Sequence, residues 1–238
     1  MDTTLSSSEH DDLKQAAAAK AIEYVADGMV VGLGTGTTAR HVVEDLGARV
    51  AAGLRIVGIP TSERTTALAR DLGIPLSTLE DHPQIDVTID GADEIDLSTF
   101  YAVKGLGGAL LREKIVALAT ALEIIVVDAT KIVTKLGTHA PVPVEVATFG
   151  WSRTRQSLAS LGCDPILRTT PDGSPYITDS GNYLLDCRFP PIDDPSTLAA
   201  QIKAITGVVD HGLFLNVVGS VIIASPQGVQ VIDKPTGS

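Results

Sequence analysis

Short apolar runs alternate with amphipathic stretches along the first half of the chain. The uninterrupted apolar run at residues 29–33 is typical of a central parallel strand, and the largely apolar segments 55–59, 74–79, 85–89 and 123–127 predict further strands. Helical spacing of apolar residues and helix-end signals predict helices over about 8–28, 37–46, 62–72 and 108–121. These repeated strand–helix units predict an α/β, doubly wound, mostly parallel (Rossmann-like) sheet, in which ligands bind at the carboxyl ends of the strands.

The pattern changes near Pro141. From there the chain predicts strand, helix, strand, strand, helix and strand at residues 142–147, 153–161, 165–169, 176–187 (with a turn at 180–182), 195–205 and 208–215. This order is that of a small ferredoxin-like α+β unit. Two final apolar runs around a Ser-Pro-Gln-Gly turn predict a hairpin that returns to the first sheet. We therefore expect an α/β domain of residues 1–138 plus 216–238 and a second, smaller α+β domain of residues 139–215.

Composition narrows the classes of partner. A net charge of −11 argues against nucleic acid or an anionic membrane surface as the main partner, but a small anionic substrate still fits. No apolar run reaches the roughly 18–20 residues of a transmembrane helix, and the polar start of the chain lacks the pattern of a signal peptide. We therefore expect a cytoplasmic protein without nucleic-acid or membrane partners. Cys163 and Cys187 match no metal-binding spacing and are expected to be free thiols.

A loop rich in glycine and threonine, residues 32–38, follows the first predicted strand and opens a helix. Backbone N–H groups at a helix start, together with the hydroxyls of Thr35, Thr37 and Thr38, suit an anion such as phosphate. The loop does not match the dinucleotide-binding pattern, because Thr37 stands where the third glycine would be, and it lacks the ending of a Walker A loop. The alternative is a tight turn that needs glycine for its backbone conformation alone.

Two lysines are candidate cations for the same anion. Lys131 stands just past the predicted strand 123–127, and Lys14 lies on the first predicted helix. An ordinary surface position is the alternative for both, and for Lys14 taken alone it is the favoured one.

Two aspartates follow the predicted strand 85–89, in the sequence Asp90-Gly91-Ala92-Asp93-Glu94. The stretch lacks the pattern of a calcium loop and no histidine lies near it in sequence, so we expect no metal site. Asp90 and Asp93 are better placed as partners of substrate hydroxyls. Asp96 is expected to be solvated.

A lysine and a glutamate follow these aspartates. Lys104 precedes a glycine-rich loop and could stabilise a developing enediolate oxygen. Helical periodicity assigns three apolar residues to the core face of the next helix: Leu111, Ile115 and Leu118. Glu113 then points away from the sheet, so that periodicity alone predicts a solvated charge. Only if that face were covered could Glu113 serve as a general base.

These motifs resemble those of ribose-5-phosphate isomerase, type A, over nearly the whole chain. The resemblance is carried in order by Gly34-Thr35-Gly36-Thr37-Thr38, Asp90-Gly91-Ala92-Asp93-Glu94, Lys104-Gly105-x-Gly107, Arg112-Glu113-Lys114, Asp128-Ala129-Thr130-Lys131, Pro143-Val144-Glu145-Val146, and Gly207-Val208-Val209 with His211-Gly212-Leu213-Phe214. It implies an aldose–ketose isomerase of the non-oxidative pentose phosphate pathway that interconverts ribose 5-phosphate and ribulose 5-phosphate without a cofactor. It also implies a homodimer or homotetramer.

The same resemblance implies roles for individual residues. Glu113 would accept the proton, and Lys104 would stabilise the enediolate. Either Asp90 or Asp93 would assist opening of the sugar ring. Contacts with the pentose 5-phosphate are implied for these two aspartates and for Thr35, Gly36, Thr37, Thr38, Gly91, Ala92, Lys104, Gly105, Leu106, Gly107, Lys131 and Lys14.

Two departures from the family pattern stand out. Leu106 occupies a position where many relatives have glycine, which puts the local loop shape in doubt. One extra residue between Asp93 and Lys104 is expected to lengthen a turn around residues 97–99.

Two other classes of protein fit a related fold. One is a non-catalytic sugar-phosphate-sensing module, which the acidic charge and the full set of candidate catalytic groups disfavour. The other is a coenzyme A transferase, a sugar-phosphate deaminase or a lactonase. A transferase would form a glutamyl thioester, and a deaminase would release ammonia.

Overall fold

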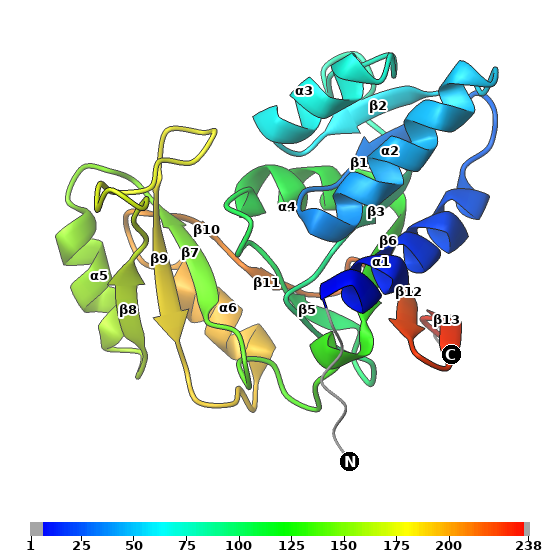
Figure 1. Cartoon of the computed structure of the whole chain (residues 1–238). Coiled ribbons are helices and arrows are strands. Elements are labelled where there is room, and N and C mark those ends of the chain that lie inside the picture. The colour runs from blue at the N-terminus through cyan, green and yellow to red at the C-terminus, as the bar shows by residue number, and fades with distance from the viewer. Residues whose placement is uncertain (1–6, 236–238) are drawn as a thin grey trace. The chain divides into compact units, whose positions relative to one another are not determined.

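The computed structural model describes residues 7–235 (Figure 1). Contacts divide the chain into two units, each of which is described by itself. Unit 1 comprises residues 1–91, 116–131 and 218–238, and unit 2 comprises residues 92–115 and 132–217. The expected domain boundaries near residues 138 and 215 stay a prediction. Within residues 7–235, no helix combines the length and the hydropathy needed to cross a membrane.

A six-stranded sheet forms the centre of unit 1. Its strands are β1 (Val30–Leu33), β2 (Val57–Pro60), β3 (Ile85–Asp90), β6 (Thr120–Asp128), β12 (Val218–Ser225) and β13 (Gly228–Asp233). They lie in the order β13-β12-β6-β3-β1-β2, and every pairing is parallel except that of the β12–β13 hairpin. The predicted mostly parallel, doubly wound sheet and the return of the last hairpin to it are both confirmed.

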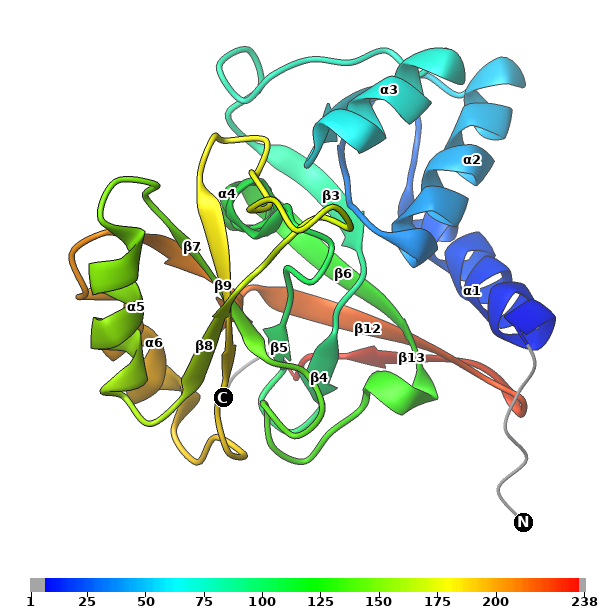
Figure 2. The same cartoon turned by 60° about the vertical axis from the view of Figure 1, so that its left-hand side comes forward.

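Helices cover this sheet because its strands are apolar on both faces. The helices of unit 1 are α1 (Ser7–Ala21), which continues into the 3-10 helix η1 (Ile22–Tyr24), α2 (Thr37–Ala51) and α3 (Glu63–Asp71). Helices α1 and α2 lie side by side (Figures 1 and 2), and their buried residues share one core with Val31 and Leu33. Val30, one residue out of phase, packs in a second cluster with Ile59 and Ile85, as strand alternation requires.

Three predicted elements of unit 1 differ from the structure, one of them being α2, which was expected to end at residue 46 and continues to Ala51. The strand predicted at 74–79 is wrong, because that segment makes only an isolated bridge between Leu76 and Gly58. Pro75 within it has no N–H to donate to a ladder. The first helix was expected to continue to Gly28, but its helical conformation ends at Tyr24.

An antiparallel sheet and two helices form most of unit 2. The elements run in the order β7 (Val142–Val146), α5 (Trp151–Ala159), β8 (Asp164–Leu167), β9 (Tyr183–Arg188), α6 (Pro195–Lys203) and β10 (Val208–His211). The strands lie in the order β10-β7-β9-β8, all antiparallel. Both helices pack on one face, where Leu158 and Ile202 join the strand residues in one core (Figure 2). The predicted ferredoxin-like unit is therefore confirmed.

A third, three-stranded sheet was not predicted. It consists of β4 (Glu94–Asp96), β5 (Tyr101–Val103) and β11 (Leu213–Phe214), in the order β11-β5-β4. The strand predicted at 208–215 is therefore two strands in different sheets, separated at Gly212. The helix α4 (Leu110–Leu118) follows β5 after the glycine-rich loop.

A turn lies between β4 and β5, at the residues where an extra residue was expected; its lengthening relative to the family stays a prediction. Asp96 is not simply solvated, because its carboxylate accepts hydrogen bonds from Ser98 N (2.8 Å) and Thr99 Oγ1 (2.9 Å). Phe100 closes the turn with a left-handed φ of 57°. The remaining predicted strand, 176–187, is confirmed only from Tyr183, since the residues before it make isolated bridges.

Candidate active site

Polar groups of unit 1 gather at the carboxyl ends of three neighbouring parallel strands. The loop Thr35–Thr38 follows β1, Asp90 ends β3, and Lys131 ends the 3-10 helix η2 (Ala129–Lys131) directly after β6. Because these strands are adjacent and parallel, their carboxyl ends lie along the same edge of the sheet. The structure thus brings these three predicted site segments to one edge, while Lys14 lies half-buried on α1.

Asp90 holds the glycine-threonine loop in place. Its Oδ1 accepts hydrogen bonds from the backbone N–H of Thr35 (3.0 Å) and of Gly91 (2.7 Å). A Cβ on residue 34 would lie 2.3 Å from that same oxygen, so the close approach of the carboxylate requires glycine there. Asp90 is 1% exposed. This carboxylate is therefore part of the loop's own framework.

The threonines of the loop differ in their surroundings. The Thr35 hydroxyl is buried, is hydrogen-bonded to the Thr61 hydroxyl (2.7 Å) and donates to the Ser62 hydroxyl (2.9 Å). Thr37 is exposed at the first position of α2, and Thr38 is half-buried. The hydroxyl of Thr35 thus ties the loop to the start of α3, whereas Thr37 lies where an anion would meet the N-terminus of α2.

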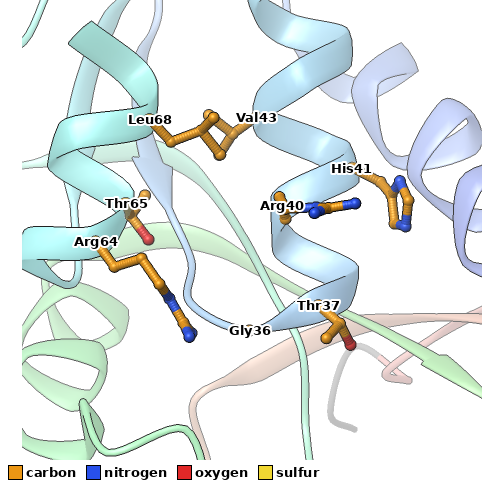
Figure 3. Close-up of a pocket in the computed structure, with 8 residues that line it drawn as sticks. All are labelled: Gly36, Thr37, Arg40, His41, Val43, Arg64, Thr65 and Leu68. Atoms are coloured by element: carbon orange, nitrogen blue, oxygen red, sulfur yellow. The ribbon is translucent and has the colours of Figure 1, made fainter. Parts of the chain in front are cut away.

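A pocket of 430 Å³ adjoins this loop (Figure 3). Its lining comprises Gly36, Thr37, Arg40, His41, Val43, Arg64, Thr65 and Leu68. Arg64 extends from α3 toward the loop at Gly36 (Figure 3), and Arg40 is paired with Glu44 at 3.4 Å. Sequence reasoning missed both arginines. The helix-start signal at Ser62, which is confirmed by its hydrogen bond from Thr65 N, could have directed attention to Arg64.

The candidate acid and cation of unit 2 lie next to each other. Lys104 directly follows β5, Glu113 lies in the first turn of α4, and Nζ is 3.6 Å from Oε2. Lys104 is 2% exposed and Glu113 is 4% exposed. The Lys104 Nζ also lies 5.4 Å from the centroid of the Phe214 ring, which is itself buried. The start of α4 stabilises a negative charge on Glu113 through the helix dipole.

The face predicted for α4 is wrong. Glu113 was expected to be solvated, but it shares the buried stripe of the helix with Leu110 and Ala117. Ile115 and Leu118, assigned to the core by periodicity, are 47% and 69% exposed. Apolar residues occur on two sides of this helix, so the pattern alone selects the wrong side. A carboxylate in a buried helical stripe is disfavoured by desolvation, which makes Glu113 a candidate functional position.

The glycine-rich loop is joined to Asp93. The Asp93 Oδ2 accepts a hydrogen bond from Leu106 N (2.9 Å), and Asp93 N donates to Val103 O (2.8 Å). Among the described non-glycine residues only Phe100 and Asn216 have positive φ, so Leu106 adopts its loop conformation without backbone strain. Leucine at this position is therefore compatible with the backbone conformation of the loop.

The last acid of the 90–94 motif has a structural role. Both Glu94 carboxylate oxygens are buried and accept hydrogen bonds from backbone amides of another loop: Gly137 (2.6 Å), Ala140 (2.8 Å) and His139. Glu94 thus fixes the segment before β7. Sequence reasoning did not separate this role from the roles of the two aspartates.

In unit 1, helix-start amides and threonine hydroxyls at the sheet edge could bind an anion such as phosphate. In unit 2, the buried carboxylate–ammonium pair could serve proton transfer, so the two units together suggest an enzyme that acts on a small phosphorylated substrate. Comparison with known proteins makes this class specific. The chain belongs to the family described as Ribose 5-phosphate isomerase A (phosphoriboisomerase A), whose family model matches residues 57–228.

Relatives of known identity match almost the whole chain. A ribose-5-phosphate isomerase A from Synechococcus sp. (strain JA-3-3Ab) is 52% identical over 223 residues, which cover 93% of this chain and 97% of that protein. The solved ribose 5-phosphate isomerase A from Methanocaldococcus jannaschii has a TM-score of 0.91 and 38% identity, covering 94% of this chain and 100% of its own. A D-ribose-5-phosphate isomerase in complex with phospho-erythronic acid also has a TM-score of 0.91, with 36% identity, covering 94% and 99%.

Proposed function

We propose that this chain is an aldose–ketose isomerase that interconverts D-ribose 5-phosphate and D-ribulose 5-phosphate through an enediolate. The observation that carries the proposal is the buried Glu113–Lys104 pair, with 3.6 Å between Oε2 and Nζ. A carboxylate base and an ammonium group side by side are what proton transfer next to a carbonyl requires. The family membership and the similarity to isomerases of ribose 5-phosphate support this substrate.

The proton transfer is assigned to unit 2. Glu113 removes the proton from C2 of the open-chain aldehyde, and electron density moves onto O1 to give the enediolate. Lys104 and the amides of the glycine-rich loop stabilise that negative charge. Glu113 then delivers the proton to C1 while the hydroxyl proton moves from O2 to O1, and the ketose results. No cofactor enters this scheme.

Binding of the phosphate is assigned to unit 1. We expect the amides and hydroxyls of residues 35–38 to hold it at the start of α2, with Lys131 as the principal cation. Lys14 and Arg64 are further candidates. A phosphate held in this way contributes similarly to binding of the substrate and of the transition state.

Ring opening is assigned to Asp93 rather than to Asp90. Asp90 is 1% exposed, and its Oδ1 accepts hydrogen bonds from two backbone amides of the loop. Asp93 is half-buried, so its carboxylate is the more accessible one for proton transfer at the ring oxygen. Asp90 would act by shaping the phosphate loop.

We further propose a cytoplasmic homodimer or homotetramer with no nucleic-acid or membrane partner. The free thiols Cys163 and Cys187 fit a reducing compartment, and the family resemblance supports an oligomer. Light scattering of the purified protein would decide between one, two and four copies.

Turnover in deuterated water tests the reaction. The purified protein would be incubated with ribose 5-phosphate and excess EDTA in ²H₂O, and the product followed by NMR. We expect ketose with deuterium at C1, because the proton held by a carboxylate base exchanges with solvent. Binding of ribose 5-phosphate without turnover would indicate the sensing module instead. Ketose without deuterium at C1, and no deuterium at C2 of the remaining aldose, would contradict the enediolate route.

A further inference from the structure

An arginine of the four-stranded sheet in unit 2 contacts the glycine-rich loop that follows Lys104. Arg168 lies directly after β8, and its Nη1 donates hydrogen bonds to the backbone carbonyls of Gly105 (3.2 Å) and Leu106 (3.0 Å). Its Nε and Nη2 donate to the two carboxylate oxygens of Asp186 on β9, at 2.9 and 2.5 Å. On one side, a bidentate ion pair with Asp186 thus fixes the guanidinium. On the other side, the guanidinium is hydrogen-bonded to the loop.

A tyrosine from the same region packs on the far end of the loop. Tyr176 N donates to Arg168 O (2.9 Å), and the Arg168 guanidinium carbon lies 5.9 Å from the centroid of the Tyr176 ring. Gly108 has a φ of 89°, and a Cβ on this residue would lie 2.3 Å from the Tyr176 hydroxyl oxygen, so backbone conformation and packing both favour glycine at that position. Arg168 and Tyr176 therefore contact both ends of the loop.

Because each peptide is planar, the contacts of the loop carbonyls also fix the direction in which the loop N–H groups point. In a trans peptide the C=O and the following N–H point to opposite sides. The Gly105 carbonyl faces Arg168, and the N–H of the same peptide, that of Leu106, donates to Asp93 on the other side. The Leu106 carbonyl also faces Arg168, so the N–H of Gly107 is directed away from it. Within the described part of the chain that Gly107 N–H makes no hydrogen bond.

We propose that Arg168, held by Asp186, is a positioning residue that directs the Gly107 amide at the enediolate oxygen stabilised by Lys104. The inference rests on the proposed isomerase function for its chemistry, but not for its geometry. The two charge-assisted hydrogen bonds to carbonyls also polarise the peptides and strengthen their N–H groups as donors. Arg168 itself does not touch the reacting atoms in this scheme.

Four variants and one control test the proposal. Arg168→Met removes the charge and the donors, Arg168→Lys keeps the charge without the fork, Asp186→Asn weakens the ion pair, and the fourth combines Arg168→Met with Asp186→Asn. The matched control is Arg188→Met, since Arg188 on β9 also donates to a backbone carbonyl, that of His139 (3.3 Å), but outside the loop. Hydrogen exchange of the Leu106 and Gly108 amides and the separate values of kcat and KM are the readouts.

We expect Arg168→Met to accelerate exchange of the two loop amides at least tenfold. Its kcat should fall about 10- to 100-fold with KM changed less than threefold, because removal of one oxyanion donor costs about 10²–10³ in kcat. Arg168→Lys should recover less than a third of the loss. The double variant should be no worse than Arg168→Met, because the two residues act as one unit. Arg188→Met should match the unmodified protein in every readout.

The outcomes separate this proposal from the proposed function. If the unmodified protein converts ribose 5-phosphate but Arg168→Met behaves like Arg188→Met, the positioning role is refuted and the function stands. If the unmodified protein does not convert the sugar, but loop protection is lost in Arg168→Met, the function fails and the grip on the loop stands. A rise in KM with unchanged kcat would also refute the positioning role. Should Arg168→Met not fold, Arg168→Lys and Asp186→Asn carry the same comparison.

Discussion

Replacing Glu113 by glutamine is the sharpest perturbation that the structure offers. The amide has nearly the shape of the carboxylate and fits the same buried position, where Glu113 is 4% exposed. It removes the proposed base and the negative charge that lies 3.6 Å from Lys104 Nζ. The loss of activity then reports the chemistry of one group rather than a repacked helix.

The expected loss follows from the role of a general base. Such a base contributes about 10²–10⁴-fold, so kcat should fall at least 100-fold, or about 2.7 kcal/mol in activation free energy. Glu113→Asp keeps the charge but withdraws the carboxylate by about 1.5 Å. Because a misplacement of about 1 Å can cost 10²-fold, the aspartate variant should also lose about two orders of magnitude.

Ketose formation from ribose 5-phosphate in excess EDTA would be measured for both variants beside Glu123→Gln. Glu123 is also buried, at 2% exposure, but lies in the middle of β6, outside the proposed site. Its glutamine variant should keep kcat within about twofold, which controls for the loss of any buried carboxylate. A fall of less than tenfold in folded Glu113→Gln would refute Glu113 as the base.

Three further predictions concern the phosphate, the pocket and pH. In steady-state kinetics, Lys131→Ala should raise KM for ribose 5-phosphate about tenfold or more with little change in kcat, because a phosphate contact acts equally on the ground and transition states. A loss confined to kcat would contradict this role. Arg64→Gln should raise KM a few-fold and weaken the salt dependence of kcat/KM, and an unchanged salt dependence would exclude the arginine from steering the anion. Burial and the nearby Lys114 lower the pKa of His211 to about 4, so the neutral ring is favoured in the folded state. The contribution of His211 to the free energy of unfolding is therefore complete above about pH 6.5 and falls by about 3 kcal/mol toward pH 4. In urea unfolding at pH 7 and 4.5, the His211→Asn protein should lose less stability than the unmodified protein, and an identical loss would refute this prediction.

The regular parts of the fold could be predicted because their physics is local. Continuous apolar runs mark strands that are covered on both faces, and the Ser62 cap marks the start of α3. The order of elements after Pro141 was enough for the ferredoxin-like sheet. The short sheet of β4, β5 and β11 could not be predicted in this way, because β11 has two residues and pairs with a segment more than 100 positions earlier.

The candidate site likewise contains residues whose positions follow from local sequence and residues whose positions do not. The glycine-threonine loop and Asp90 stand next to predicted strands, so their place at the sheet edge follows from the sequence. The burial of Glu113 does not, because helical periodicity chose the side of Ile115 and Leu118. The role of Arg168 could not be predicted from the sequence for a different reason. Its contact with the loop joins residues 62 and 63 positions apart, and nothing in its own neighbourhood indicates a role.

The places where local rules fail in unit 2 are the places where chemistry is expected. A buried ion pair is weak evidence for stability, since well-packed apolar side chains of similar volume are often as stable or more so. Lys104 and Glu113 therefore stand in the core at a disadvantage that packing does not explain. The loop beside them carries glycines where a Cβ would collide, and an arginine with four hydrogen bonds holds its peptides in one orientation. The proposed mechanism, in which a base, a cation and an amide act on one enediolate, needs this rigidity, because each group acts only at short range and in a fixed direction.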